Sequence, residues 1–222
     1  MTQARRRDAL VMLLTAGVGA ANVLSLTALG GVPASVMTVN LVLVGLSITH
    51  HQGTLGWHAG AALAAFALGV VLTSRLTGKQ DADRPVWPRR VTLAVAAEAL
   101  PLIGVAVGWG LADGRPTGAL QLVLCAVTAF AMGIQSMAVR ALGAAGLSST
   151  FFTGQLTDAL RDLAGPAPHR WTRGATGVVA LLAGAAAQGA VLAGGQRFAP
   201  LLPLALTCCV AVLSARGFSR AE

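Results

Sequence analysis

One acidic residue lies deep inside a long apolar stretch. Glu98 stands about eight residues into the run 91–112, and no basic residue lies within one helical turn of it. A carboxylate at the centre of a bilayer costs about 2.5–3.5 kcal/mol on insertion scales, so we expect Glu98 to face other helices. We interpret it as a group that couples transport to a proton or cation, or that contacts a solute. The alternative is a protonated carboxyl group that bonds two helices together.

Four amide side chains form two matched pairs. Asn22 and Gln135 lie 113 positions apart in long apolar runs, and Asn40 and Gln155 lie 115 positions apart in shorter runs. An amide offers a donor and an acceptor together, which suits a neutral polar solute or an exposed carbonyl group. The alternative is that each amide only holds two helices together, through a hydrogen bond worth about 0.6 kcal/mol.

Both pairs belong to a repeated pattern. In each copy an amide stands seven residues before Leu-Gly, a glycine-containing break follows, and then comes Thr-x-Asn/Gln-Leu, with Thr38 and Thr153 as the threonines. Duplicated halves of membrane proteins bind solutes where the halves meet. Asp158 has no acidic counterpart in the first copy, and we interpret it as an acid facing a cavity or a local partner of Arg161. The predicted solute or ion pathway contains Asn22, Thr38, Asn40, Glu98, Gln135, Thr153, Gln155 and Asp158.

The composition predicts a membrane protein. Hydrophobic residues make up 55% of the 222 residues and charged residues only 11%, whereas soluble domains carry about 25% charged residues. The mean hydropathy is +0.71. The net charge of +8 does not indicate nucleic-acid binding, because the basic residues fall in short loops between apolar runs, where they orient a protein in the bilayer.

Six apolar runs are long enough to span a bilayer, which takes roughly 20 residues. They are 9–28, 57–74, 91–112, 118–140, 174–194 and 198–215. The runs 34–49 and 147–160 are shorter. Six crossings place 14 of the 16 basic residues on the cytoplasmic side and leave only Arg115 and Arg197 outside, whereas eight crossings place 9 inside. The positive-inside rule therefore favours six spans with the two short runs as re-entrant half-helices.

The predicted fold is all-α. It is a polytopic helical bundle with six transmembrane spans and two re-entrant half-helices in a single membrane domain over residues 1–222. Repeat one covers 8–112, repeat two covers 117–216, and a cytoplasmic linker covers 77–88. Because each repeat has three spans, an odd number, the second copy enters the membrane from the opposite face. We therefore expect the two half-helices to enter from opposite faces and to meet near the midplane.

Two segments carry a family resemblance. Residues 131–138 (AMGIQSMA) and 149–157 (STFFTGQLT) are similar to the hallmark of the YoaK-like family, bacterial integral membrane proteins grouped as a domain of unknown function. The resemblance covers nearly the whole chain. It implies a bacterial integral membrane protein, but the family supplies no established substrate. Asn22 stands where the family pattern has an acid, and Val39 replaces a glycine. If that acid carries protons in relatives, this chain lacks the step.

We expect a small secondary transporter or permease that moves a small solute through a polar site at the midplane. The alternatives are a passive channel, as a homodimer, or a non-transporting assembly or lipid-binding protein. The expected partners are the lipid bilayer and the solute, with both termini cytoplasmic in a bacterial cytoplasmic membrane. We expect no enzyme, because no nucleophile–base pair, metal-ligand set or nucleotide loop is visible, and no cofactor. His50, His51 and His58 are expected in a surface loop.

Overall fold

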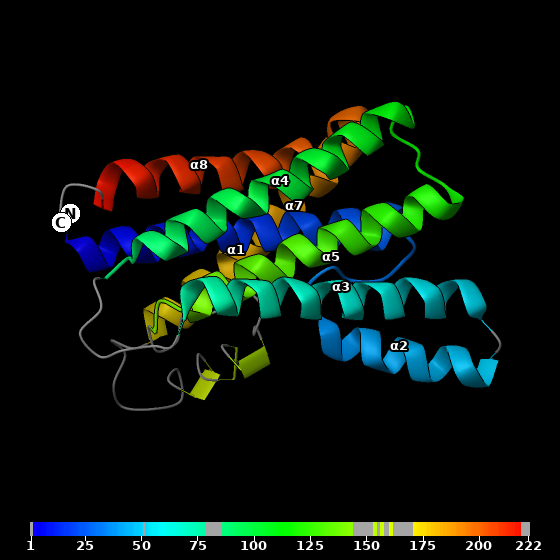
Figure 1. Cartoon of the computed structure of the whole chain (residues 1–222), viewed down its shortest axis with the longest axis horizontal. Helices are drawn as coiled ribbons and strands as arrows, with labels where there is room; N and C mark the ends of the chain where they lie inside the picture. Colours follow the sequence, from blue (N-terminus) through cyan, green and yellow to red (C-terminus); the bar gives the residue numbers. More distant parts are fainter. Residues whose placement is uncertain are drawn as a thin grey trace.

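The computed structural model describes residues 2–50, 52–78, 86–143, 153–154, 156–157, 160–161 and 171–218. All regular elements among these residues are helical (Figure 1). They are α1 (Gln3–Ala28), α2 (Met37–His50), α3 (Gly53–Thr77), α4 (Arg89–Leu111), α5 (Gly118–Arg140), α7 (Trp171–Gly194), the 3₁₀ helix η1 (Gln196–Phe198) and α8 (Leu201–Phe218).

Six helical stretches are long and apolar enough to cross a membrane, which confirms the six predicted spans. The first begins at Gln3 and not at residue 9, because Thr2 caps the helix and charged residues continue it beyond the apolar run. The last was predicted from residue 198, but η1 comes first and α8 begins at Leu201. Pro203 fits the first turn of α8, where its missing N–H is tolerated.

The chain turns back on itself after α1. Gly30 and Gly31 have φ angles of 97° and 77°, which glycine adopts at low cost. Ser35 then hydrogen-bonds Asn22, which lies about 9 Å before the end of α1 at 1.5 Å per residue. α2 starts there and runs back to the end of the bundle where α3 begins (Figure 1). Its 14 residues span about 21 Å, less than the bilayer core of about 30 Å. This matches the predicted half-helix at 34–49, whereas most of the second, at 147–160, lies outside the described residues.

The start of α1 and the end of α8 lie at the same end of the bundle, which we call the terminal end (Figure 1). Arg6 at the start of α1 donates to the Gly217 carbonyl near the end of α8 at 3.5 Å. The end of α3, the start of α4 and the end of α5 lie at the same end, and they bring Arg75, Arg89, Arg90 and Arg140 to it. Arg115 and Arg197 lie at the opposite end. Apolar side chains on the outer faces of α2 and α4, such as Leu41 and Leu100, are exposed and contact lipid.

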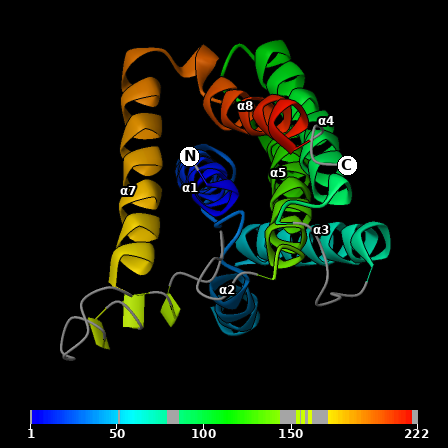
Figure 2. The same ribbon diagram turned by 90° about the vertical axis from the view of Figure 1, so that its left-hand side faces the viewer.

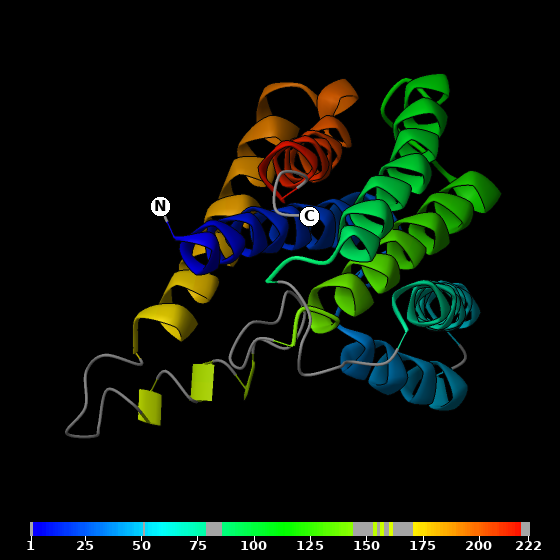
Figure 3. The ribbon, with the colours of Figure 1, turned by 60° about the vertical axis from the view of Figure 1, so that its left-hand side comes forward.

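Two closely packed helix pairs form the centre of the bundle, and α1 belongs to one of them. Figure 2 shows α7 on one side of α1 and α5 with α8 and α4 on the other. α1 packs mainly on α7 and α8, while α5 packs mainly on α3 and α4. Figure 3 shows α2 and α3 together below α5, away from α8. We call α1 with α7 the first pair, and α3 with α5 the second pair.

Each pair crosses at glycine. A methyl group added at Gly184 of α7 would overlap the carbonyl oxygen of Ala16 in α1, and one at Gly19 of α1 would overlap the carbonyl oxygen of Leu181 in α7. The backbones of the first pair are therefore in direct contact. Small residues allow this approach in membranes, where dispersion contacts hold helices together.

The second pair repeats this crossing. A methyl group at Gly69 of α3 would overlap the carbonyl oxygen of Phe130, and one at Gly133 of α5 would overlap that of Phe66. Gly69 and Gly184 are 115 positions apart, the offset already seen after the break, while Gly19 and Gly133 are 114 apart. The α1 and α5 crossing positions thus differ by one from the 113 offset of the amides.

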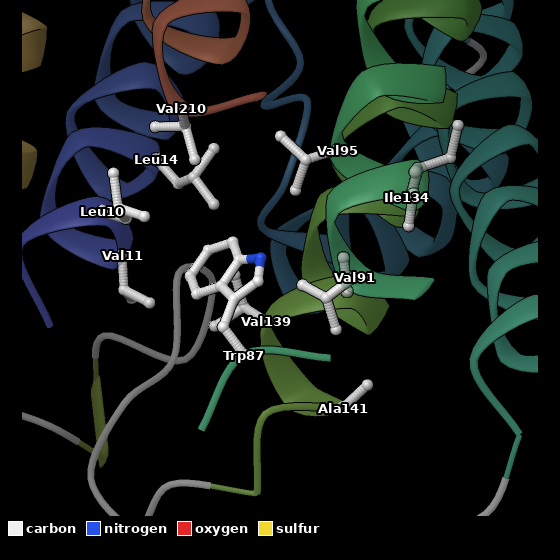
Figure 4. Packing of buried hydrophobic residues seen from close by; sticks show 12 residues of the cluster. Leu10, Val11, Leu14, Trp87, Val91, Val95, Ile134, Val139, Ala141 and Val210 are labelled. Atoms are coloured by element: carbon white, nitrogen blue, oxygen red, sulfur yellow. The ribbon is translucent and has the colours of Figure 1, made fainter. Parts of the chain in front are cut away.

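Three apolar clusters fill the bundle. The terminal-side cluster joins α1, α4, α5 and α8 through residues such as Leu14, Val95, Ile134 and Val210, whose side chains converge in Figure 4. The central cluster contains Val18, Ala21, Ala34, Leu102, Ala131 and Met132. The far-side cluster includes Leu24, Leu29, Trp109 and Leu124.

Candidate functional site

Glu98 lies on the fully buried face of α4. Its neighbours one turn away on this face, Val95 and Leu102, are 0% and 2% exposed, and Glu98 itself is 0% exposed. Residues three and four apart share a face of a helix, so this stripe must point into the bundle. Glu98 thus faces other helices, as its cost in lipid requires.

Thr207 of α8 is the hydrogen-bond partner of Glu98. Its hydroxyl group donates to Glu98 Oε1 at 3.1 Å, and both side chains are buried. The second carboxyl oxygen, Oε2, is buried and has no hydrogen-bond partner among the described residues. Sequence analysis missed Thr207, because a single threonine in an apolar helix carries no signal of its own.

The carboxyl group lies between two apolar clusters. Val95, one turn before Glu98, belongs to the terminal-side cluster, and Leu102, one turn after, belongs to the central cluster. On α8, Val210 of the terminal-side cluster and Leu204 beside the central cluster flank Thr207 in the same way. The carboxyl group is therefore enclosed by hydrocarbon along the bundle axis.

Gln135 of α5 occupies the same level. Its neighbours Ile134 and Ala131 belong to the terminal-side and central clusters. Gln135 Nε2 donates to the carbonyl oxygen of Leu14 in α1 at 3.1 Å, and Oε1 has no partner. Thr15, next to Leu14, is fully buried and its hydroxyl group also lacks a partner among the described residues. We call Glu98, Thr207, Gln135 and Thr15 the acid layer.

Asn22 and Asn40 hold the break between α1 and α2. Asn22 donates to Ser35 Oγ at 2.8 Å and accepts from the Ser35 backbone N–H at 3.1 Å. Asn40, fully buried, donates to the Pro33 carbonyl at 2.9 Å. Ala34 between these partners belongs to the central cluster, which adjoins the acid layer. The two amides thus fix broken backbone beside the central cluster, which also contains Leu102 of α4.

The other predicted pathway residues do not join this group in the described structure. Thr38 is exposed on α2, and Thr153 is exposed in a helical segment. Gln155 and Asp158 lie outside the described residues. The structure therefore buries Glu98 and Gln135 between the same two apolar clusters and places Asn22 and Asn40 at the break between α1 and α2.

A sequence family described as "Protein of unknown function (DUF1275)" matches residues 10–214, which include the break and the whole acid layer. The chain belongs to this family. The UPF0700 transmembrane protein YoaK of Bacillus subtilis (strain 168) is 36% identical over 165 residues, 74% of this chain and 71% of that protein. The family resemblance seen in residues 131–138 and 149–157 is thereby confirmed. No solved structure matches the chain.

In this DUF1275 chain, Gln188 donates a hydrogen bond to a carbonyl group that proline leaves without its usual helical donor. Pro203 has no N–H to give to the carbonyl group four residues earlier, that of Ala199. Gln188 Nε2 in α7 donates to this carbonyl oxygen instead, at 2.9 Å. The amide of Gln188 therefore ties α7 to the start of α8, and its Oε1 is left buried without a partner.

The expectation of a surface position is wrong for His58. The side chain is 4% exposed, and Nδ1 lies 2.8 Å from the Thr54 carbonyl oxygen. The ring packs against Gly30, where a Cβ atom would overlap it. The missing side chain at the break thus makes room for a buried imidazole. His50 is exposed as expected, and His51 lies outside the described residues.

An open pocket of about 650 Å³ lies at the end of the bundle opposite the termini. Asp113, Arg115 and Arg197 line it together with the backbone around Gly194 and Gly195. Arg197 donates to Asp113 at 2.8 Å, and both side chains are largely exposed. No acid-layer residue lines this pocket, so it is separate from the candidate site.

Proposed function

We propose that this DUF1275 protein is a small secondary transporter whose acid layer couples solute movement to an ion. The observation that carries the proposal is Glu98, a fully buried carboxyl group with one unpartnered oxygen. It is enclosed between apolar clusters, and the central one also contains Ala34 of the break. Discontinuous helices near the midplane form the solute and ion sites of many transporters. Irregular backbone at this depth is tolerated against protein or a water-filled cavity.

A purely structural role requires Glu98 to be protonated, because the bond from Thr207 does not stabilise an ionised carboxylate enough. The insertion cost of a central carboxylate is about 2.5–3.5 kcal/mol. A single hydrogen bond contributes about 0.5–1.5 kcal/mol, so the bond from Thr207 does not offset that cost. A glutamine or serine at this position would bond the helices at lower cost. Only an acid can release a proton or balance a bound cation here, so the presence of glutamate at this buried position supports the transport proposal.

The two glycine crossings support an inverted repeat. Each crossing joins helices from different halves of the chain. The crossing glycines match the 115 offset in α3 and α7 and lie one residue off the 113 offset in α1 and α5. In this arrangement each helix pair moves as one body, because the backbone contact leaves no room for sliding. The hydrogen bond from Gln135 to Leu14 joins the two bodies within the acid layer. Rocking of one body against the other would open the layer to either side in turn.

The charge distribution supports cytoplasmic termini in a bacterial cytoplasmic membrane. Among the described residues, arginines gather at the terminal end of the bundle, with Arg115 and Arg197 at the other. Basic loops stay on the cytoplasmic side. α2 then runs from the middle of the membrane to the outer face.

Solute flux in proteoliposomes tests the proposal. Purified protein is reconstituted with a trapped pH-sensitive dye, and a panel of amino acids, sugars, polyols, ureas and small carboxylates is added under proton and sodium gradients. We expect at least one solute to be accumulated against its gradient, and Glu98→Gln to abolish accumulation. Asp8→Asn, a matched acid-to-amide change beside Arg7 at the terminal end, should leave it intact.

Two outcomes would overturn the proposal. Flux that runs only down the solute gradient and ignores both ion gradients would make the protein a passive channel. Accumulation that is equal in wild type and Glu98→Gln would remove Glu98 from the mechanism. Glu98→Asp keeps the charge and serves as the second variant if the amide fails to fold.

A further inference from the structure

The open pocket at the end of the bundle opposite the termini has a mixed lining. Its volume of about 650 Å³ falls within the range of about 300–1,000 Å³ that is typical of small-molecule sites. Three charged side chains and three apolar ones line it, those of Asp113, Arg115, Arg197, Leu192, Ala193 and Phe198. Phe198 is 63% exposed, so its ring is available to a ligand. A pocket with this lining suits a ligand that is both charged and apolar.

The lining of this pocket carries one net positive charge. Arg197 donates to Asp113 at 2.8 Å, so these two charges balance each other. The guanidinium group of Arg115 has no hydrogen-bond or ion-pair partner among the described residues. Guanidinium groups bind phosphate and carboxylate oxygens through parallel hydrogen bonds. The pocket therefore offers one uncompensated charge to a ligand that carries one negative charge.

Both arginines lie at the end of the bundle where basic residues are uncommon. Basic residues gather in the loops on one side of a membrane protein, and the described arginines here gather at the terminal end. Arg115 and Arg197 lie at the opposite end, 82 positions apart in the sequence, and both line this pocket. Two arginines that only anchored loops would not need to share one pocket. Their convergence therefore favours an anionic ligand.

The turns that carry the two arginines are held together by contacts of their own. Trp109 at the end of α4 donates from Nε1 to the Gln196 carbonyl oxygen of η1 at 2.7 Å. Gly114, next to Arg115, has a φ angle of 81° and packs against η1, because a Cβ atom there would lie 3.2 Å from the backbone nitrogen of Arg197. The backbone of the pocket is therefore preorganised, which reduces the entropy lost on binding.

We infer that this pocket binds the phosphate group of an anionic phospholipid. The pocket lies at the ends of α4 and α7, which are both long and apolar enough to cross the membrane, and lipid headgroups lie at that level. Basic pockets between transmembrane helices bind such headgroups. Arg115 fits the single charge of a phosphodiester, while Leu192 and Phe198 fit the adjoining glycerol and acyl carbons. Inorganic phosphate shares the charge of this ligand but has no apolar part for these side chains.

A bound lipid would join elements from both halves of the chain. Asp113 and Arg115 belong to the turn that follows α4, and Arg197 belongs to η1, between α7 and α8. A ligand that binds only the folded protein stabilises it by mass action, so binding should appear as a saturable rise in Tm. The inference does not rest on transport, and its failure would leave the transport proposal unchanged.

Lipid titration of the purified protein tests the inference. Melting is followed by tryptophan fluorescence in neutral detergent while phosphatidylglycerol is added, with phosphatidylcholine of the same acyl chains as the comparison. Glycerol 3-phosphate and inorganic phosphate are titrated in parallel to distinguish a lipid from a soluble anion. We expect a saturable rise in Tm with phosphatidylglycerol, and a much smaller one with phosphatidylcholine or either soluble anion. Added NaCl should weaken the effect, because exposed arginines are screened by salt.

Two exposed arginines provide a matched pair of variants. Arg115→Gln and Arg90→Gln each remove a guanidinium group that has no partner among the described residues, but Arg90 lies at the terminal end. We expect Arg115→Gln to weaken phosphatidylglycerol binding about tenfold, through the loss of a charge-assisted hydrogen bond, and Arg90→Gln to leave it unchanged. Asp113→Asn should strengthen binding, because it leaves both arginines of the pocket uncompensated.

Equal rises in Tm with the two lipids would overturn the inference, as would a phosphatidylglycerol effect that persists in Arg115→Gln. An equal rise with glycerol 3-phosphate would assign the pocket to a soluble anion and would contradict lipid binding. Weaker binding in Asp113→Asn would contradict the argument from net charge, since the ion pair itself would then be what the lipid requires.

Discussion

Replacing glycine by alanine at a helix crossing should destabilise the protein, whereas the same change on an open face should not. At Gly184 the added methyl group meets the backbone of Ala16, so α1 and α7 must move apart. At Gly189, also in α7, an added methyl group meets nothing within 4 Å. Both variants gain the same helix propensity of up to about 1 kcal/mol, so their difference isolates the crossing.

The magnitude follows from overpacking. Inserting a methylene-sized group into a packed interior costs about 1–3 kcal/mol. For a chain of this length each kcal/mol shifts Tm by about 2–4 °C, so Gly184→Ala should melt roughly 2–12 °C below Gly189→Ala. The second pair offers a replicate in α3, because Gly69 meets the backbone of Phe130 and Gly60 meets nothing within 4 Å.

The assay is thermal unfolding in detergent, followed by tryptophan fluorescence. The two crossing variants should melt early and the two open-face variants at or above wild type. Equal Tm values for Gly184→Ala and Gly189→Ala would refute the argument that backbone contact holds the first pair together. A lowered Tm in the first pair alone would contradict the equivalence of the two crossings.

Substitutions at three further positions have defined outcomes. Gly30→Ala should lower Tm, because φ is 97° there and the new Cβ atom overlaps the ring of His58; thermal melting checks this. Thr207→Val should destabilise by about 1–3 kcal/mol, since it leaves the buried carboxyl group of α4 without its donor, whereas Thr207→Ser should restore most of the loss in the same melt. Asn22→Asp should be tolerated because a carboxylate can accept both bonds from Ser35, whereas Asn22→Leu should lower Tm by leaving the Ser35 N–H buried and unbonded. Equal melting of the aspartate and leucine variants would contradict this account of the break.

The spans were predictable because they depend on local composition. Apolar runs of about 20 residues define a membrane helix with no knowledge of its neighbours. The short length of 34–49 and the Gly-Gly pair before it indicated the half-helix that became α2. The burial of Glu98 followed from the cost of a carboxylate in lipid. Each of these inferences needs only the segment itself and the bilayer as solvent.

Side-chain partners were less predictable, because they depend on which helices pack together. The amides were expected to line one shared site, yet Asn22 and Asn40 bond the break and Gln135 bonds α1. Thr207 and Thr15 could be recognised as candidate site residues only from their neighbours in space. His58 is buried because Gly30, which packs against its ring, has no side chain. The hydrophobic periodicity of the sequence gives no sign of this contact.

The most direct test of the transport account is access to the acid layer from water. Cys125, Cys208 and Cys209 are replaced by alanine, and Thr207→Cys, at a position 1% exposed in this structure, is probed in oriented vesicles with a membrane-impermeant thiol reagent. Asp113→Cys, at an exposed position at the opposite end of the bundle, is the control, because it should be accessible from one side of the membrane only. We predict that the cysteine at 207 reacts from both faces, while the control reacts from the outside only. A cysteine at 207 that reacts from neither face would contradict alternating access to Glu98.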